Sequence, residues 1–394
     1  MKPLLFALAL GLLLAPAVSS AQAPSPTYAQ LMDQSGAQMQ AKDFCAAVAT
    51  FEQAFRPDST RANEFELFTG AIAAANCPAR RPLAWRWLGQ LSRHRPLSIQ
   101  PRDLDNVAND PMLAPLRIEA AWPRWLAAMR QALAQQTADA QTASTRWIAE
   151  AQARTLPTAK GKVRAAAAPG FALYFSQVPA DTVRMPYLVR VPAGYDPAKP
   201  APVVVYLHGG VVSTKQFGYA DRDVAEETIF EVAPANALVV YPFGRASFGW
   251  VTQPAAFAQI EQILAEVQAR YRTDGRRTVL GGMSNGGSAA LWFASQRPAP
   301  FSGFYALSPA PVLPLQASYG RLGQGKPCYQ LSAQDDSLYK YKAVKATYDA
   351  RPSQAAQWFL QTLPGGGHGF LYRPEGPALL RQTLATLCAP PKPR

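Results

Sequence analysis

Apolar residues recur at different spacings in the two halves of this 394-residue chain. From Tyr28 to about Arg154 they return every three or four positions, as in Phe44, Ala47 and Phe51, and β-rich runs are scarce. That spacing matches one face of a helix. We therefore expect the first half to be all helix.

The second half changes to short apolar runs, separated by stretches with helical spacing. Eight strands are expected, near residues 171–178, 186–191, 203–207, 237–241, 278–280, 304–307, 329–333 and 357–363. Strands that alternate with helices predict an α/β fold, with a doubly wound, mostly parallel sheet covered on both faces.

Composition places the boundaries between these regions. Residues 155–170 (TLPTAKGKVRAAAAPG) lose the helical spacing and gain Pro, Gly and positive charge, which is typical of a linker. The sequence thus predicts a helical domain over 27–154, this linker, and an α/β domain over 171–394.

The first 21 residues read as a secretory signal. One early lysine, Lys2, precedes an apolar run from Leu4 to Val18 and the small residues Ser19-Ser20-Ala21. A membrane anchor is the alternative, but the run is short and is interrupted by glycine and proline. We expect a periplasmic or secreted protein without a membrane span.

Export makes the four cysteines candidates for disulfides. Their positions suggest pairing Cys45 with Cys77, and Cys328 with Cys388. No C-x-x-C pair occurs and there are only three histidines, so a metal site is not expected. The net charge of +13 comes from dispersed Lys and Arg rather than a basic stripe, which argues against nucleic-acid binding.

The clearest chemical motif lies at residues 282–286, where Gly-Met-Ser-Asn-Gly fits G-x-S-x-G around Ser284. A β-branched run precedes it and an Ala-rich helical stretch follows it. This order predicts a nucleophile elbow, in which a serine sits on a strained strand-to-helix turn and glycines remove the side chains that would collide.

Four segments in order resemble the α/β-hydrolase family over about 220 residues. They are VPAGYDPAKPAPVVVYLHGG (191–210), RYRTDGRRTVLGGMSNGG (270–287), LSAQDDSL (331–338) and GGGHGF (365–370). The second resembles exported esterases related to feruloyl esterases and polyhydroxybutyrate depolymerases. The resemblance implies a serine esterase that needs no cofactor.

A serine nucleophile needs a general base, and histidine is the usual one. His94 lies among arginines in the helical half, and His208 precedes two glycines where an imidazole usually braces a turn. His368, on a triple-glycine turn after the last strand, is therefore the expected base, with His208 as the alternative.

The acid that orients the histidine is Asp335 or Asp336. In the resembled family it follows the glycine that ends the strand by three residues, and Ala333 takes that glycine's place here. This spacing favours Asp336, which would leave Asp335 as a solvated turn residue. The expected oxyanion hole consists of the amides of Asn285 and Gly210, with Val211 as an alternative to Gly210.

Within the helical half, DFCAAVATFEQAF (43–55) resembles the second helix of a tetratricopeptide repeat. Stacked repeats present a concave face, which would imply a protein partner. The alternative is a helical cap that packs on the catalytic domain.

The expected function is cleavage of small or oligomeric carboxylic esters through an acyl-enzyme. The segment from Pro309 to Gly325 is too short for a long lid, so we expect an open site and a preference for short-chain or aryl esters. Aromatic residues expected near it are Phe217, Tyr219, Phe248, Trp250, Tyr339, Phe370 and Tyr372. A peptidase or amidase, and a catalytically inert binding module, are the alternatives.

Overall fold

The computed structural model describes residues 26–56, 61–159, 164–178, 183–210, 222–244, 249–322 and 325–390. The predicted signal at 1–21 lies outside them. By its internal contacts the chain divides into two units, Met1–Asp139 and Ala140–Arg394. Among the described helices, none is both long and apolar enough to cross a membrane.

The first unit is helical in its described part, as predicted. Its helices are α1 (Tyr28–Gln40), α2 (Phe44–Phe55), α3 (Glu64–Ala75), α4 (Arg81–Leu91), α5 (Pro101–Asn109), α6 (Ala114–Arg117) and the start of α7 (Ala121–Ala153), with 3-10 turns at Pro78–Arg80 and Pro111–Leu113. Side chains of Thr27, Asp43 and Asn63 cap the first three helices. Of the apolar residues predicted to line one face of α2, Ala47 and Phe51 are buried in one core with α3 and α4, whereas Phe44 is half-buried.

A disulfide joins Cys45, near the start of α2, to Cys77, just after α3. The two helices are consecutive and in contact, and the Cα atoms of the two cysteines lie 5.1 Å apart. The predicted pairing of Cys45 with Cys77 is therefore present.

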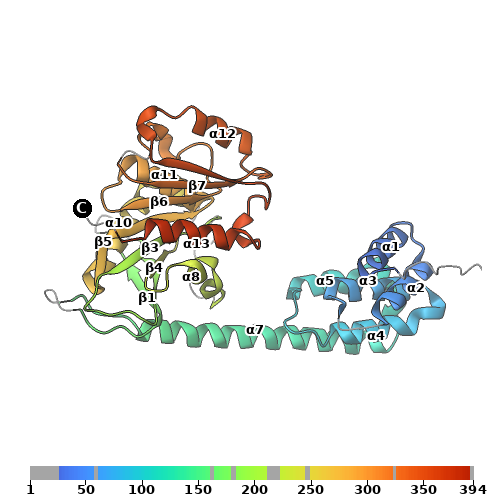
Figure 1. The fold of residues 1–394 in the computed structure, drawn as a ribbon. Coiled ribbons are helices and arrows are strands. Elements are labelled where there is room, and N and C mark those ends of the chain that lie inside the picture. The colour runs from blue at the N-terminus through green and yellow to red at the C-terminus, as the bar shows by residue number, and fades with distance from the viewer. Residues whose placement is uncertain are drawn as a thin grey trace, which may run out of the picture. The chain divides into compact units, whose positions relative to one another are not determined.

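The second unit is built on one eight-stranded sheet of order β1-β2-β4-β3-β5-β6-β7-β8 (Figure 1). The strands are β1 (Gly170–Ser176), β2 (Met185–Val191), β3 (Ala201–Leu207), β4 (Leu238–Pro242), β5 (Thr273–Met283), β6 (Gly303–Leu307), β7 (Cys328–Ala333) and β8 (Trp358–Leu363). Only β1–β2 and β2–β4 pair antiparallel. The predicted α/β fold with a mostly parallel sheet is confirmed.

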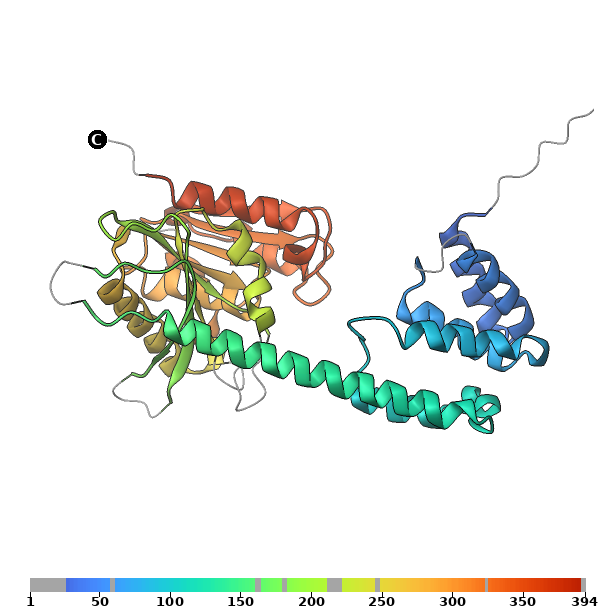
Figure 2. The same cartoon turned by 90° about the horizontal axis from the view of Figure 1, so that it is seen from below.

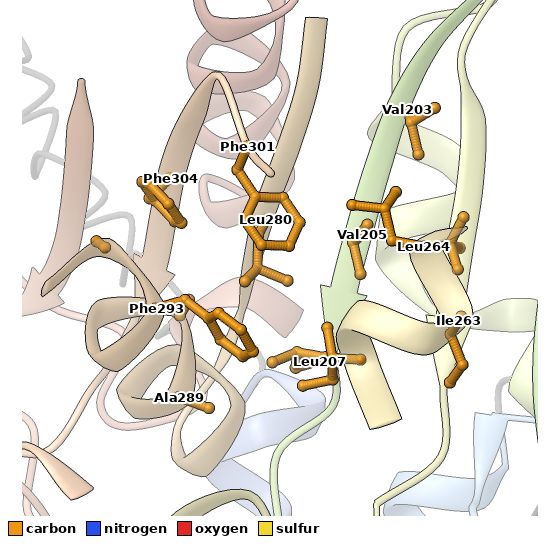
Figure 3. Close-up of a cluster of buried hydrophobic side chains, with 14 of the residues drawn as sticks. Val203, Val205, Leu207, Ile263, Leu264, Leu280, Ala289, Phe293, Phe301 and Phe304 are labelled. Carbon is orange, nitrogen blue, oxygen red and sulfur yellow. The ribbon is translucent and has the colours of Figure 1, made fainter. Parts of the chain in front are cut away.

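Helices cover both faces of this sheet. One face packs against α9 (Gly249–Thr252), α10 (Pro254–Arg270) and α11 (Asn285–Gln296), and the other against α8 (Thr228–Val232), α13 (Gly376–Leu387) and the end of α7. Side chains alternate between the two cores: Val203, Val205 and Leu207 of β3 face α10 and α11 (Figure 3), while Val204 and Tyr206 face the other core. The remaining helix, α12 (Tyr341–Asp349), follows β7.

The predicted pairing of Cys328 with Cys388 is wrong in the structure, where both are free and buried. Cys328 begins β7 and packs in the core beneath α10 and α11, whereas Cys388 follows α13 and packs in the opposite core. The sheet therefore separates the two thiols. Burial raises the pKa of each to about 12, so neither has thiolate character at neutral pH.

The predicted linker at 155–170 packs against the second unit in its described part. The Leu156 amide donates to the Tyr174 hydroxyl at 2.7 Å, and the Ala159 amide donates to the carbonyl of Ala269 in α10 at 3.0 Å. The end of α7 also belongs to this unit (Figure 2). There Trp147 packs on Phe171 of β1, with ring centroids 5.9 Å apart. The boundary between the units therefore lies inside α7.

Candidate active site

Ser284 stands between the end of β5 and the start of α11, as the motif predicts. Its backbone has φ 53° and ψ −116°, a conformation that non-glycine residues rarely adopt. The Ser284 amide donates to the Leu307 carbonyl at the end of β6 (2.8 Å), which fixes the turn against the sheet. The predicted strand–turn–helix geometry is confirmed.

Glycines flank Ser284 because the end of β3 lies against the turn. A Cβ added to Gly282 would lie 2.3 Å from the Leu207 carbonyl oxygen, and one added to Gly286 would lie 2.0 Å from the same atom. No side chain fits at either position. Helix α11 can thus start directly beneath the end of β3.

His368 lies between Ser284 and Asp336. Its Nε2 is 2.9 Å from Ser284 Oγ, and its Nδ1 is 2.9 Å from Asp336 Oδ2. The three residues follow β5, β7 and β8, whose carboxyl ends meet at one edge of the sheet because these strands are parallel. The Asp336 side chain is 2% exposed and the His368 side chain 22% exposed, so the carboxylate is shielded while the imidazole reaches the surface.

Both oxygens of Asp336 are engaged. Oδ2 contacts the imidazole, and Oδ1 accepts hydrogen bonds from the amides of Leu338 (2.9 Å) and Tyr339 (2.8 Å). These bonds hold the carboxylate in one orientation. With His368 Nδ1 as donor, Nε2 is left as an acceptor for the Ser284 hydroxyl, which is the tautomer that a general base requires.

Asp335 differs from the expected solvated turn residue. It is exposed, but its carboxylate accepts hydrogen bonds from the amides of Gly366 (3.2 Å) and Gly367 (2.8 Å), in the turn that carries His368. The carboxylate of Asp335 thus bonds the backbone of the turn, whereas that of Asp336 bonds the imidazole and is in the orienting position.

His208 braces the turn after β3 instead of approaching Ser284. Its Nδ1 lies 2.8 Å from the Gly209 carbonyl oxygen, and its Nε2 accepts from the Gly244 amide at 2.8 Å. These partners select the neutral Nδ1–H tautomer. Burial lowers the pKa of His208, opposed in part by the bond to Gly209. The third histidine, His94, lies in the helical unit.

The two residues expected to form the oxyanion hole are connected. Gly210 has φ +76°, and its carbonyl accepts from the Asn285 Nδ2 at 3.2 Å. Asn285 is the first residue of α11, where a backbone amide has no acceptor within its own helix. The alternative, Val211, lies outside the described residues.

Two side chains at the site were not assigned these roles from the sequence. Tyr339 packs edge-on against the His368 ring, with centroids 5.1 Å apart, and its hydroxyl donates to Asn285 Oδ1 at 3.4 Å. The hydroxyl of Ser308, after β6, donates a hydrogen bond to the His368 carbonyl at 2.9 Å. Ser308 directly follows β6, the strand that pairs with β5, and this position is the one signal in the sequence that could have suggested it.

The other aromatic residues predicted near the site differ in their exposure. Trp250 and Phe370 are buried in the core, at 4% and 1% exposure, so they cannot stack on a substrate. Tyr372 is 56% exposed. Phe217, Tyr219 and Phe248 lie outside the described residues.

Acidic, cysteine and histidine side chains do not cluster into a metal site anywhere in the described ranges. The hydroxyl of Ser284, the imidazole of His368 and the carboxylate of Asp336 lie in line, an arrangement suited to acyl transfer.

Comparison with known proteins gives one family match. A family model described as "Putative esterase" matches residues 182–360, which include Ser284 and Asp336 and end before His368. This match supports an ester hydrolase. A search of curated proteins found no match.

Solved structures with a similar fold include three hydrolases. A thermostable esterase is 18% identical (TM-score 0.42), covering 54% of this chain and 59% of its own. An S-formylglutathione hydrolase from Agrobacterium tumefaciens is 16% identical (TM-score 0.41), covering 55% of this chain and 94% of its own. An esterase from Thermogutta terrifontis is 17% identical (TM-score 0.44), covering 57% of this chain and 96% of its own. This chain thus spans less than two thirds of the length of the thermostable esterase. At these scores the likenesses say nothing about substrate.

Proposed function

We propose that this chain is an exported serine carboxylic ester hydrolase with Ser284 as nucleophile, His368 as general base and Asp336 as the orienting acid. The observation that carries the proposal is His368, which lies 2.9 Å from Ser284 Oγ on one side and 2.9 Å from Asp336 Oδ2 on the other. Both distances are within hydrogen-bond range, so a proton can pass from the serine to the imidazole.

In this mechanism Ser284 Oγ attacks the ester carbonyl while its proton moves to His368 Nε2. Asp336 stabilises the resulting imidazolium. The alcohol leaves with that proton, and an acyl group remains on Ser284. Water, deprotonated by His368, then attacks the acyl-enzyme and releases the acid. The amides of Asn285 and Gly210 would stabilise the oxyanion in both steps.

Export is supported by the disulfide between Cys45 and Cys77, since such bonds persist in oxidising compartments. A protein partner of the helical unit remains part of the proposal, on the repeat resemblance alone.

Short-chain or aryl esters are the proposed substrates. The described part of the connection between β6 and β7 contains only short 3-10 turns, at Pro314–Gln316 and Tyr319–Arg321, and no long lid helix. Next to the site, Tyr339 and the 60% exposed Leu338 offer apolar surface beside His368. An open, partly aromatic rim suits small acyl groups better than long chains.

The test is a p-nitrophenyl ester series of increasing acyl length, run beside methyl ferulate, an acetylated sugar and a peptide p-nitroanilide. We expect the highest kcat/KM on short or aryl esters. An optimum at long chains would contradict the open site, and turnover of the anilide alone would indicate a peptidase. Labelling by a fluorophosphonate, absent in Ser284→Ala, separates an enzyme from an inert binding module.

A further inference from the structure

We propose that Asp335 is a positioning residue, whose carboxylate holds the backbone of the turn that carries His368. The kinetic part of this inference rests on the proposed function, because it concerns how that base is placed. The hydrogen bonds that carry it are those from the amides of Gly366 and Gly367 to Asp335 Oδ2 and Oδ1.

The glycines of the turn are what allow two successive amides to reach one carboxylate. Gly366 has φ +108° and Gly367 has φ +64°, both in the region that L residues rarely adopt. Successive amides in such a turn form a concavity that binds an anion. Here the chain's own Asp335 fills it, and a Cβ added to Gly365 would still lie 3.5 Å from Asp335 Oδ2.

Neighbouring carboxylates therefore hold two parts of the same turn. Asp336 contacts the imidazole of His368 at 2.9 Å, and Asp335 contacts the backbone one and two residues before it. Because both belong to one dipeptide after β7, the turn after β8 is fixed to that strand by side chain and main chain together. The imidazole then has little freedom to leave Ser284.

Ser308 restrains the same turn from the other side. Its hydroxyl donates to the His368 carbonyl at 2.9 Å, and it is 1% exposed with φ +43°. With Ser308 on the carbonyl of His368 and Asp335 on the preceding amides, removal of Asp335 frees only one end. The turn should shift rather than unfold.

Because Asp335 is exposed, its effect on the position of His368 can be separated from its effect on stability. Hydrogen bonds at exposed sites add little to the free energy of folding, whereas a displacement of about 1 Å at a reacting group can lower a rate about 100-fold. We expect Asp335→Ala to lower kcat for p-nitrophenyl acetate by about 10- to 100-fold, with KM changed less than about 3-fold and the melting temperature nearly unchanged.

Two further variants complete the series. Asp335→Asn keeps one acceptor and turns a donor towards the second amide, so its kcat should lie between those of Asp335→Ala and the wild type. Asp349→Ala is the matched control, because Asp349 is an exposed aspartate of the same unit whose carboxylate pairs with Lys345. Its kcat should equal that of the wild type.

A second readout does not depend on turnover. The Nδ1 proton of His368, bonded to Asp336, should give a far-downfield proton NMR signal, assigned by its loss in His368→Gln. We expect this signal to broaden or disappear in Asp335→Ala and to persist in Asp349→Ala.

The outcomes are distinct. Graded loss of kcat with a preserved KM and a disturbed His368 signal supports the proposal. Wild-type kcat and an unchanged signal in Asp335→Ala overturn it. If the wild type hydrolyses no ester, the proposed function fails and the NMR comparison alone decides the positioning role. Should Asp335→Ala not fold, Asp335→Asn provides the same comparison.

Discussion

Gly286 is the residue at which the elbow tolerates least change. A Cβ there would lie 2.0 Å from the carbonyl oxygen of Leu207, a backbone atom that cannot move without displacing β3. We expect Gly286→Ala to lower the free energy of unfolding by about 2–3 kcal/mol, measured by urea denaturation, and to impair turnover. Gly275→Ala is the control, since an added Cβ there has no neighbour within 4 Å and stability should hardly change. Equal stability of both variants would contradict the close packing.

Asp336 and the hydroxyl of Ser284 contact opposite nitrogens of the same imidazole, that of His368. In Asp336→Asn an amide NH₂ would face His368 Nδ1, which then becomes the acceptor and leaves Nε2 protonated. The base is lost while the fold stays, so kcat should fall about 10⁴-fold with little change in KM. If Asp336→Asn kept wild-type kcat, Asp336 would not be the acid.

His208 couples stability to pH. Burial lowers the pKa of His208, so the folded state binds fewer protons than the unfolded state, in which a histidine titrates at about 6.5. Its stabilising contribution is complete above that pH and is lost as the pH falls towards the folded pKa. Urea unfolding between about pH 5 and 7.5 should therefore show stability falling on acidification, and less steeply in His208→Gln. Identical slopes would mean that His208 is not responsible.

At the scale of elements, the strands were predictable because their β-branched runs are short and bounded by turn residues. The order of Ser284, Asp336 and His368 along the chain was visible for the same reason, since each follows a strand. The contacts of Asp335 and Ser308 could not be predicted, because both residues bond the backbone of a turn whose path no residue pattern encodes.

The cysteines also show that the sequence predicts local contacts better than contacts set by tertiary packing. Cys45 and Cys77 lie on consecutive helices, so their separation follows from local structure. Cys328 and Cys388 are separated by the sheet itself, and which face α13 covers depends on tertiary packing. The repeat resemblance of residues 43–55, which form α2, stays a prediction.

The disulfide should stabilise the helical unit. It closes a loop with a sequence separation of 32, for which chain entropy gives about 3–4 kcal/mol. Replacing both Cys45 and Cys77 by alanine should lower the melting temperature of this unit and leave ester turnover intact.

In the unmodified chain, a thiol reagent in denaturant without reductant should detect two thiols per chain, Cys328 and Cys388. Detection of none would restore the pairing that the structure excludes.

For the whole molecule, the cores predict where the chain can be divided. The core of the helical unit uses residues from Leu31 to Leu133, whereas both cores of the sheet unit begin at or after Ala151, with Trp147 packed against one of them. Among the described residues, no side chain belongs to a core of both units.

The chain from Ala140 onward should therefore fold and retain ester hydrolysis, while a chain from Thr155 onward should be less stable. The second fragment lacks Trp147, Ile148 and Ala151, and so uncovers Phe171 of the edge strand β1, which also packs on Phe230 of α8. In the full chain, Trp147→Ala should lower the unfolding free energy of the sheet unit by about 3 kcal/mol. The neighbouring exposed Arg146→Ala should not change it. Chemical denaturation, followed by ester turnover, measures the stability of the two fragments and of the two variants. Equal stability of the two fragments would show that the second half of α7 is not part of the sheet unit's core.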